Sequence, residues 1–149
     1  MYYGASVLPF TIEPRTRNVY FILGKEVYKQ KYRWCDFGGK RDFDENRAEI
    51  TASREFAEET LCMLRIDNEH RKKYYLTVME KMKAALVTKQ YIFRLNIKNI
   101  VTQNTEYVVF VKYVPFDTDI VRRFHWCRST LLNMRKNNTQ TTLSDHPAI

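Results

Sequence analysis

Glycine, proline and cysteine are scarce in this sequence, and each shortage excludes a class of protein. The 149 residues include four glycines and four prolines, too few for a fibrous or linker-rich chain. The three cysteines, Cys35, Cys62 and Cys127, are widely spaced and form no C-x-x-C pair. Neither a disulfide framework nor a cysteine zinc site is therefore indicated, and free thiols in a reducing compartment are the simplest interpretation.

Long apolar runs are also missing. No stretch approaches the roughly 20 apolar residues that a membrane-spanning helix needs, and the first eight residues lack the basic region of a signal peptide. We therefore expect a cytoplasmic or nuclear protein with no membrane partner. The hydrophobic content, 44% of the residues, suits one globular domain. We place this domain at residues 1–137, followed by a polar, flexible tail at residues 138–149.

Charge is abundant and unevenly distributed. The chain has 25 basic and 17 acidic residues, a formal net charge of +8. Residues 1–75 hold 14 basic and 12 acidic residues, whereas residues 76–149 hold 11 and 5. A basic surplus of this size is compatible with a nucleic acid, nucleotide or polyphosphate ligand. A solvated basic surface that keeps the protein soluble fits the charge equally well.

Runs of β-branched and aromatic residues bounded by turn residues predict strands. The expected strands are residues 2–12, 18–24, 31–37, 84–87, 90–97 and 105–115. Gly38 and Gly39 follow the third of them and predict a turn into a polar loop at residues 40–44.

Helical periodicity is clearest between residues 46 and 61. Ala48, Ala52 and Phe56 recur every four residues and form a narrow apolar stripe. Asp44 or Asn46 is the candidate cap of this helix.

A last helix is expected after Asp117 and Asp119, because apolar residues then recur at helical spacing as far as about residue 136. Residues 67–83 are either a second helix or a long ordered insertion. Strands and helices in this order predict an α/β sandwich, in which a mixed sheet lies between helices.

Three carboxylates on the helix at residues 46–61 break the rules of local stability. Glu55, Glu58 and Glu59 lie within one turn of each other, where like charges repel. Glu58 and Glu59 also lie near the C-terminal end, where the helix dipole disfavours anions. Arg54 offers partial compensation. The alternatives are a bound hard cation, such as Mg²⁺ or Mn²⁺, and a solvated acidic helix face.

The segment from Gly38 to Cys62 resembles the Nudix box, whose pattern is G-x5-E-x7-R-E-U-x-E-E-x-G-U, with U an apolar residue. Gly39 and Glu45 match the opening, and residues 54–60, Arg-Glu-Phe-Ala-Glu-Glu-Thr, match the core. The match covers about a sixth of the chain. It implies a Nudix-type α/β/α sandwich with a catalytic loop and helix.

Two positions depart from that pattern. Eight residues separate Glu45 from Arg54 where the pattern has seven, so Asp44 could take the role of Glu45. Leu61 stands where the pattern has glycine, which suits a left-handed helix end that leucine adopts at a cost. Neither change removes a carboxylate, and we expect activity to survive.

The resemblance implies a metal-dependent hydrolase of the pyrophosphate bond in a nucleoside diphosphate linked to another group. Matched by position, Glu55 and Glu59 would be the main ligands of Mg²⁺ or Mn²⁺. Glu58 would be a further ligand or the base on the attacking water, and the carbonyl of Gly38 a ligand from the loop. The metal would lower the pKa of water and neutralise charge on the phosphoryl oxygens.

Four further residues receive roles from the same resemblance. Arg54 would position the carboxylates through Glu45, Gly39 would be structural, and Lys40 would lie near the substrate phosphates. In some members of the family the base lies outside the box, and Glu106 is then the best acidic candidate.

The substrate is less well defined. Trp34, Phe37 and Trp126 are candidates to stack on a base. The alternative is a core position for Trp34 and Phe37, and a solvated helix surface for Trp126, which lies off the apolar stripe of the last helix. The basic surplus favours a capped RNA 5′ end, hence mRNA decapping. The alternatives are nucleoside triphosphates, dinucleoside polyphosphates, ADP-ribose, diphosphoinositol polyphosphate, or a module that binds a nucleotide or RNA without cleaving it. The oligomeric state is left open.

Overall fold

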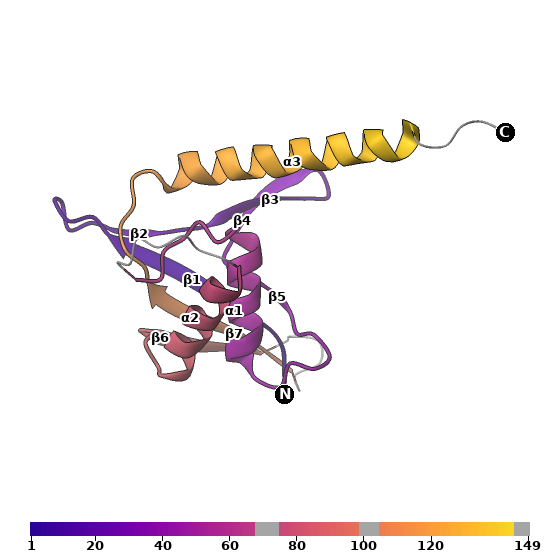
Figure 1. Cartoon of the computed structure of the whole chain (residues 1–149). Helices are drawn as coiled ribbons and strands as arrows, with labels where there is room; N and C mark the ends of the chain where they lie inside the picture. The colour runs from indigo at the N-terminus through magenta and orange to yellow at the C-terminus, as the bar shows by residue number, and fades with distance from the viewer. Residues whose placement is uncertain (68–74, 99–104, 145–149) are drawn as a thin grey trace. The chain divides into compact units, whose positions relative to one another are not determined.

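The computed structural model describes residues 1–67, 75–98 and 105–144, and the chain forms two compact units, Met1–Phe116 and Asp117–Ile149 (Figure 1). The boundary between the two units falls before the last helix, and the single domain expected at residues 1–137 stays a prediction.

Two apolar strands form the centre of a five-stranded mixed sheet in the first unit. β1 (Tyr2–Ile12) and β7 (Glu106–Tyr113) run parallel, and both are buried along most of their length. β6 (Phe93–Lys98) lies antiparallel to β7. β2 (Val19–Phe21) and β5 (Phe37–Lys40) pair antiparallel with opposite ends of β1, which gives the order β2-β1-β7-β6 with β5 beside β1. The expected mixed α/β fold is confirmed.

A separate two-stranded hairpin follows β2. β3 (Gly24–Tyr28) and β4 (Lys31–Cys35) pair antiparallel and form no ladder with the larger sheet. The sequence predicted one strand at residues 18–24 and missed β3. Lys29 and Gln30 form the turn with φ angles of 47° and 65°, a conformation that hairpins usually build from Asn-Gly or Gly-Gly. The usual turn signal was therefore absent.

The Gly38-Gly39 pair lies in a strand, which corrects the expected turn. Gly38 pairs with Ser6 and Gly39 with Ala5 in the ladder between β5 and β1. β5 then ends at Lys40, where the polar loop begins.

Two helices belong to the first unit, and α1 contacts α2 as well as β1 and β5 (Figure 1). In α1 (Ala48–Glu59) the expected stripe is confirmed, because Ala48, Ala52 and Phe56 are all buried. The expected cap is wrong. Arg47 occupies the N-cap position and makes no side-chain capping hydrogen bond.

The second helix, α2 (Tyr75–Val87), corrects the strand expected at residues 84–87. Ala84, Ala85 and Leu86 are good helix formers, and Ala85 and Leu86 continue the buried stripe that begins at Val78 and Met82. The expectation for residues 67–83 is confirmed as helix from Tyr75 onward, whereas residues 68–74 lie outside the described residues.

Aromatic side chains pack against each other on both faces of the larger sheet. Phe37 on β5 meets Phe56 on α1 edge to face, with ring centroids 6.2 Å apart. On the opposite face Phe10 packs against Phe21 and Tyr113. A phenylalanine buried in this way contributes on the order of 2 kcal/mol to stability. The contact between Phe37 and Phe56 therefore helps to hold β5 against α1.

The second unit consists mainly of one long helix, α3 (Ile120–Ser144). The predicted start is confirmed. Asp117 accepts hydrogen bonds from the backbone N–H of Asp119 and from Arg123, which ties down the first turn. The helix continues beyond the expected end near residue 136, because no glycine or proline interrupts the sequence before Pro147. Residues 138–144 of the expected tail are therefore helical.

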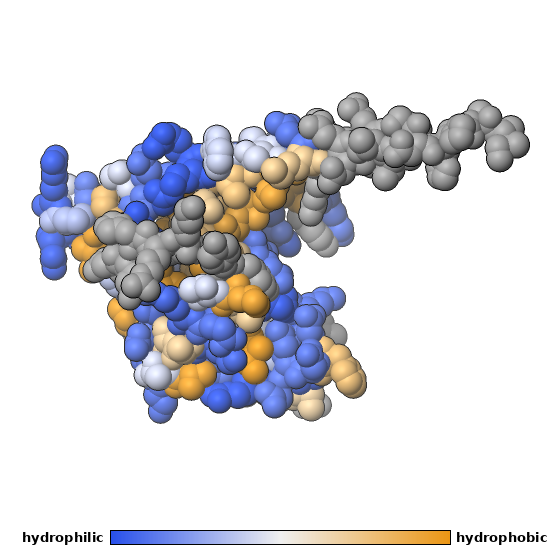
Figure 2. All heavy atoms as spheres, in the orientation of Figure 1, coloured by the Kyte–Doolittle hydropathy of each residue, from blue (hydrophilic) through white to orange (hydrophobic). Residues whose placement is uncertain are grey.

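The face of the molecule seen in Figure 2 is mostly polar. Many hydrophilic side chains cover the face seen in Figure 2, and apolar side chains reach the surface in patches between them. None of the helices in the described part of the chain is long and apolar enough to cross a membrane. All three cysteines are free thiols, as expected.

Candidate active site

The Gly38-Gly39 pair brings β5 into close contact with β1 and α1. A Cβ atom on Gly39 would lie 2.4 Å from Glu55 Oε1, and one on Gly38 would lie 2.1 Å from the Cβ of Ser6. Both distances are far below van der Waals contact. Glycine at these positions therefore lets the carboxylate of Glu55 rest on the backbone of β5.

Arg54 lies at the centre of the carboxylates predicted to form the site. Its guanidinium donates hydrogen bonds to Glu45 Oε1 at 2.9 Å, Glu55 Oε1 at 2.9 Å and Glu58 Oε2 at 3.2 Å. A fourth bond, 3.0 Å long, goes to the backbone carbonyl of Lys40. We call Arg54, Glu45, Glu55 and Glu58 the Arg54 cluster. Only a fork of several N–H donors can make these contacts together.

Glu45 is the buried anchor of the Arg54 cluster. It is 6% exposed, and its carboxylate also accepts hydrogen bonds from Thr51 Oγ1 at 2.6 Å and from the backbone N–H of Asp42 at 3.0 Å. Burial raises the pKa of Glu45, but the bonds from Arg54, Thr51 and Asp42 outweigh it, so the pKa lies below its usual value. Glu45 is thus ionised and held in place.

The extra residue before Arg54 does not separate it from Glu45. Eight residues lie between them, yet Arg54 Nε and Glu45 Oε1 are 2.9 Å apart. Asp44 is exposed, and it is Glu45 rather than Asp44 that bonds to Arg54.

Glu55 and Glu59 have raised pKa values. Burial raises the pKa of Glu55, the Arg54 charge opposes this, and the net direction is upward. Glu59 accepts a 2.8 Å hydrogen bond from the backbone N–H of Gly38. Although Glu59 reaches solvent, the protein packed around its carboxylate, together with Glu55, Glu26 and Asp36, raises its pKa to about 7. One guanidinium therefore leaves this region with excess negative charge.

The nearby carboxylates also affect the thiol of Cys35. Burial raises the pKa of Cys35 to about 11, with contributions from Glu26, Glu59 and Asp36. Cys35 lies at the end of β4, just before β5. The excess charge is therefore concentrated where the hairpin joins the glycine pair.

The side chains are not arranged as a ready metal site. Within the described ranges there is no group of three or more histidine, cysteine, aspartate or glutamate side chains that could hold a metal ion. The physical reason is the guanidinium of Arg54, which bonds to Glu55 and Glu58, while Glu59 bonds to Gly38. The donor types, carboxylates beside a backbone carbonyl, nevertheless suit Mg²⁺ or Mn²⁺.

Leu61 has the left-handed conformation that the pattern assigns to glycine. α1 ends at Glu59, and Leu61 and Cys62 follow with φ angles of 50° and 57°. A non-glycine residue in this left-handed conformation lowers stability by roughly 1 kcal/mol. α1 is therefore followed by a left-handed backbone conformation, which is strained because leucine and cysteine adopt it instead of glycine.

The remaining predicted residues divide into exposed and buried positions. The side chain of Lys40 is exposed at the end of β5, beside the cluster, and Trp34 on β4 is 64% exposed. Phe37 is 7% exposed and packs on Phe56, so it is a core residue and cannot stack on a substrate base. Trp126, 72% exposed, lies on α3 in the second unit.

Glu106 is held by a neighbour on its own side of the sheet. Its carboxylate accepts a 2.8 Å hydrogen bond from Asn96 on β6. Among the contacts of the described residues, none joins Glu106 to the Arg54 cluster. Glu58, which does contact Arg54, is the better placed of the two candidate bases.

The structure also assigns residues that the sequence analysis missed. Thr51 and Tyr2 support Glu45, since the hydroxyl of Tyr2 bonds to the Glu45 carbonyl and lies 3.1 Å from Thr51 Oγ1. Asp36 accepts a hydrogen bond from Ser6 and adds negative charge beside Glu59. Asp36 lies two residues before Gly38, a proximity that was visible in the sequence, whereas the position of Tyr2 was not.

Comparison of the chain with models of protein families, with curated proteins and with solved structures gave no match.

Proposed function

We propose that the protein is a Mg²⁺- or Mn²⁺-dependent pyrophosphohydrolase of the Nudix type, which cleaves a nucleoside diphosphate linked to a second group. The observation that carries the proposal is the Arg54 cluster itself. Arg54 bonds to Glu45, Glu55 and Glu58. Glu45 is in turn held by Tyr2, 43 residues away in the chain, and Glu55 lies against Gly39. A solvated acidic helix face has no need of a guanidinium bonded to three carboxylates.

The residues of this region would have different roles in the reaction. Glu55, Glu58, Glu59 and the Gly38 carbonyl are the groups that would hold the divalent cation, which supplies Lewis-acid activation when bound. Arg54 keeps Glu55 and Glu58 oriented through Glu45. Lys40, exposed at the edge of the cluster, would contact the substrate phosphates.

The reaction is the addition of water across a phosphoanhydride. The water oxygen attacks one phosphorus, the bridging P–O bond breaks, and the leaving phosphate carries away the bridging oxygen. Glu58 would accept the proton of the attacking water, because its side chain is exposed and its carboxylate is oriented by Arg54.

A capped RNA 5′ end is the favoured substrate, because a chain with a net charge of +8 suits a long polyanion better than a small nucleotide. The alternatives are free nucleotides, ADP-ribose and diphosphoinositol polyphosphate. A module that binds without cleaving is favoured by one observation, the guanidinium that bonds to two of the presumed ligands.

Product analysis with Mg²⁺ or Mn²⁺ tests the proposal. The substrates are capped RNA, free cap dinucleotide, nucleoside triphosphates, dinucleoside polyphosphates, ADP-ribose and diphosphoinositol polyphosphate. We expect Glu59→Gln to lower the rate by at least 100-fold. The matched control is Glu80→Gln on α2, which removes an exposed carboxylate that pairs with Lys83 and should leave the rate unchanged.

Three outcomes separate the candidate functions. Cleavage of capped RNA far above free cap supports decapping, and cleavage of a small substrate alone supports the small-nucleotide alternative. Binding of a substrate with no cleavage by the wild-type protein contradicts the hydrolase proposal and favours the binding module.

A further inference from the structure

The β3–β4 hairpin has two chemically different faces. Its register pairs Lys25 with Trp34 and Val27 with Tyr32, so these four side chains share one face. Glu26 pairs with Arg33 on the other face, where the two side chains also form an ion pair. We call Lys25, Val27, Tyr32 and Trp34 the aromatic face of the hairpin.

The aromatic face is open to solvent. Val27, Tyr32 and Trp34 are 67%, 70% and 64% exposed. The ammonium of Lys25 lies 3.9 Å from the ring centroid of Tyr32 and 5.8 Å from that of Trp34. Large aromatic side chains this exposed gain little from folding, so their presence on a strand is explained better by a ligand than by the core.

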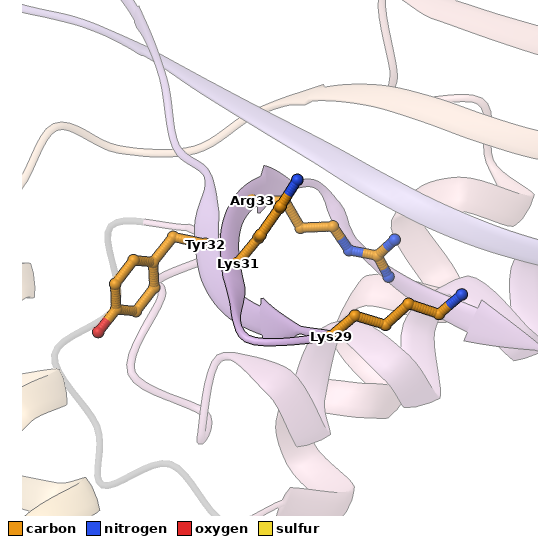
Figure 3. Close-up of a pocket in the computed structure, with 4 residues that line it drawn as sticks. All are labelled: Lys29, Lys31, Tyr32 and Arg33. Carbon is orange, nitrogen blue, oxygen red and sulfur yellow. The ribbon is translucent and has the colours of Figure 1, made fainter.

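Basic side chains surround the tip of the hairpin. Lys29, Lys31 and Arg33 extend to one side while Tyr32 extends to the other (Figure 3). The four residues line a pocket of about 410 Å³. Charges at the tip act over about 8 Å at physiological ionic strength, so they attract an anion to either face of this thin element.

We propose that the aromatic face binds single-stranded RNA, with bases stacked on Tyr32 and Trp34 and phosphates drawn to Lys25 and to the basic tip. The inference rests on the proposed function for the direction of the strand, whose 5′ end would enter the Arg54 cluster. Stacking on exposed aromatic rings beside a cationic groove is how proteins bind single strands without reading their sequence.

The hairpin is correctly placed for such a ligand. Trp34 on β4 precedes Gly38 on β5 by four residues, so their Cα atoms lie at most roughly 14 Å apart. An RNA strand on the aromatic face would therefore lie next to the candidate active site. The negative field of that site would repel the strand unless cations nearby held it, and the hairpin supplies them.

A protein partner fits this face less well. Apart from Val27 the exposed apolar groups are aromatic rings, and the ammonium of Lys25 lies over both of them. Such a composition is complementary to phosphates and bases, whereas a protein interface is depleted of lysine at its centre.

Binding can be measured without any hydrolysis. The probe is a 12-nucleotide RNA with a 5′-hydroxyl and a 3′-fluorescein, titrated with the full chain in the absence of divalent metal and followed by anisotropy. We expect Trp34→Ala to weaken binding about tenfold. The matched control is Phe93→Ala on β6, an aromatic side chain with 60% exposure on the larger sheet, for which we expect less than a twofold change.

The lysine is tested in the same assay. Lys25→Ala should weaken binding and reduce the slope of log Kd against log salt by about 0.7, the value for one phosphate contact with a single strand. Lys98→Ala, which removes an exposed lysine at the end of β6, should leave both quantities unchanged.

A local optical signal identifies the residue involved. In a Trp126→Phe background Trp34 is the sole tryptophan, and stacking on a base should quench its fluorescence as RNA is added. Equal affinities of wild type and Trp34→Ala, or an unquenched Trp34 at saturating RNA, would overturn the inference. So would a wild-type dimer that Trp34→Ala converts to a monomer, because the face would then be an interface between copies.

The failures of the two proposals remain distinguishable. If Trp34→Ala loses RNA affinity but no substrate of the panel is cleaved by wild type, the RNA surface stands and the hydrolase proposal fails. If free nucleotides are cleaved and Trp34→Ala binds RNA like wild type, the reverse holds.

Discussion

The Arg54 cluster and the β3–β4 hairpin each contain an arginine paired with glutamate, yet the two pairs differ in their surroundings. The side chain of Arg54 is 17% exposed and that of Glu45 is 7% exposed, whereas Arg33 and Glu26 are 54% and 42% exposed. Arg54 bonds to three carboxylates and a backbone carbonyl. A pair inside such a network loses much when one partner is removed, whereas an exposed pair loses little.

The contrast separates positioning from binding. The cluster is anchored by α1, β5 and Tyr2, so its carboxylates are fixed before any ligand arrives. The hairpin pairs only with itself and exposes its aromatic rings. Changes in the cluster should therefore affect stability and chemistry together, and changes in the hairpin should affect binding alone.

Removing the two arginines should give the largest difference. Arg54→Ala leaves Glu45 buried without its main partner, and we expect a loss of about 3 kcal/mol in the free energy of unfolding, or roughly 8 °C in Tm. Arg33→Ala should stay within about 0.5 kcal/mol. Thermal and urea unfolding of both variants measure this. Equal losses would contradict the contrast, and adding Glu45→Gln to Arg54→Ala should restore part of the stability.

The two adjacent glycines provide a second, smaller comparison. In Gly38→Ala the new methyl group meets Cβ and Cα of Ser6 and a backbone carbonyl, none of which can move away, and we expect a loss of about 2 kcal/mol. In Gly39→Ala it meets the flexible end of Glu55, so stability should change by less than about 1 kcal/mol.

The same pair separates stability from chemistry. We expect Gly39→Ala to reduce hydrolysis at least tenfold by displacing the Glu55 carboxylate, a loss larger than its effect on unfolding. Unfolding curves and initial rates check both variants. A Gly39→Ala protein with the wild-type rate would show that the position of Glu55 does not matter.

The smallest expected change in stability is at Lys112. Its charge is largely buried, as that of Arg54 is, but within the described ranges it lacks the carboxylate partners that Arg54 has. It is 7% exposed on β7, and no hydrogen bond or ion pair to its ammonium is present among the described residues. Burial lowers its pKa from the usual value. The unfolded chain therefore binds this proton more tightly than the folded protein does, and Lys112 destabilises the fold while both states are protonated.

Replacing Lys112 shows this as a dependence on pH. Lys112→Met should raise the free energy of unfolding by about 1 kcal/mol near pH 7. The advantage should shrink as pH rises above the lowered pKa toward 10.5. Lys98→Met, at an exposed position on β6, is the control and should show no such trend. An advantage for Lys112→Met that does not change between pH 7 and 10.5 would mean that the charge is not its source.

Local sequence carried much of the fold. The apolar stripe of Ala48, Ala52 and Phe56 predicted α1, and the β-branched runs predicted β1, β6 and β7, because a period of 3.6 or a run of strand formers sets which face is buried. The β3 strand and the part of α3 beyond about residue 136 were missed where the signals are weak. Lys29-Gln30 carries no hairpin signature, and the polar residues after Lys136 do not stop a helix.

The order of residues alone also predicted part of the candidate site. The carboxylates, Arg54 and the glycine pair are close in sequence, on one strand, one helix and the loop between them. Their arrangement in space was decided only by the tertiary structure. Sequence patterns did not predict that Phe37 is buried against Phe56 while Trp34 is exposed to solvent. Nor did they predict the hydrogen bond between Glu106 and Asn96. Those outcomes depend on how α1 and the strands pack, since burial and charge compensation are properties of neighbours distant in sequence.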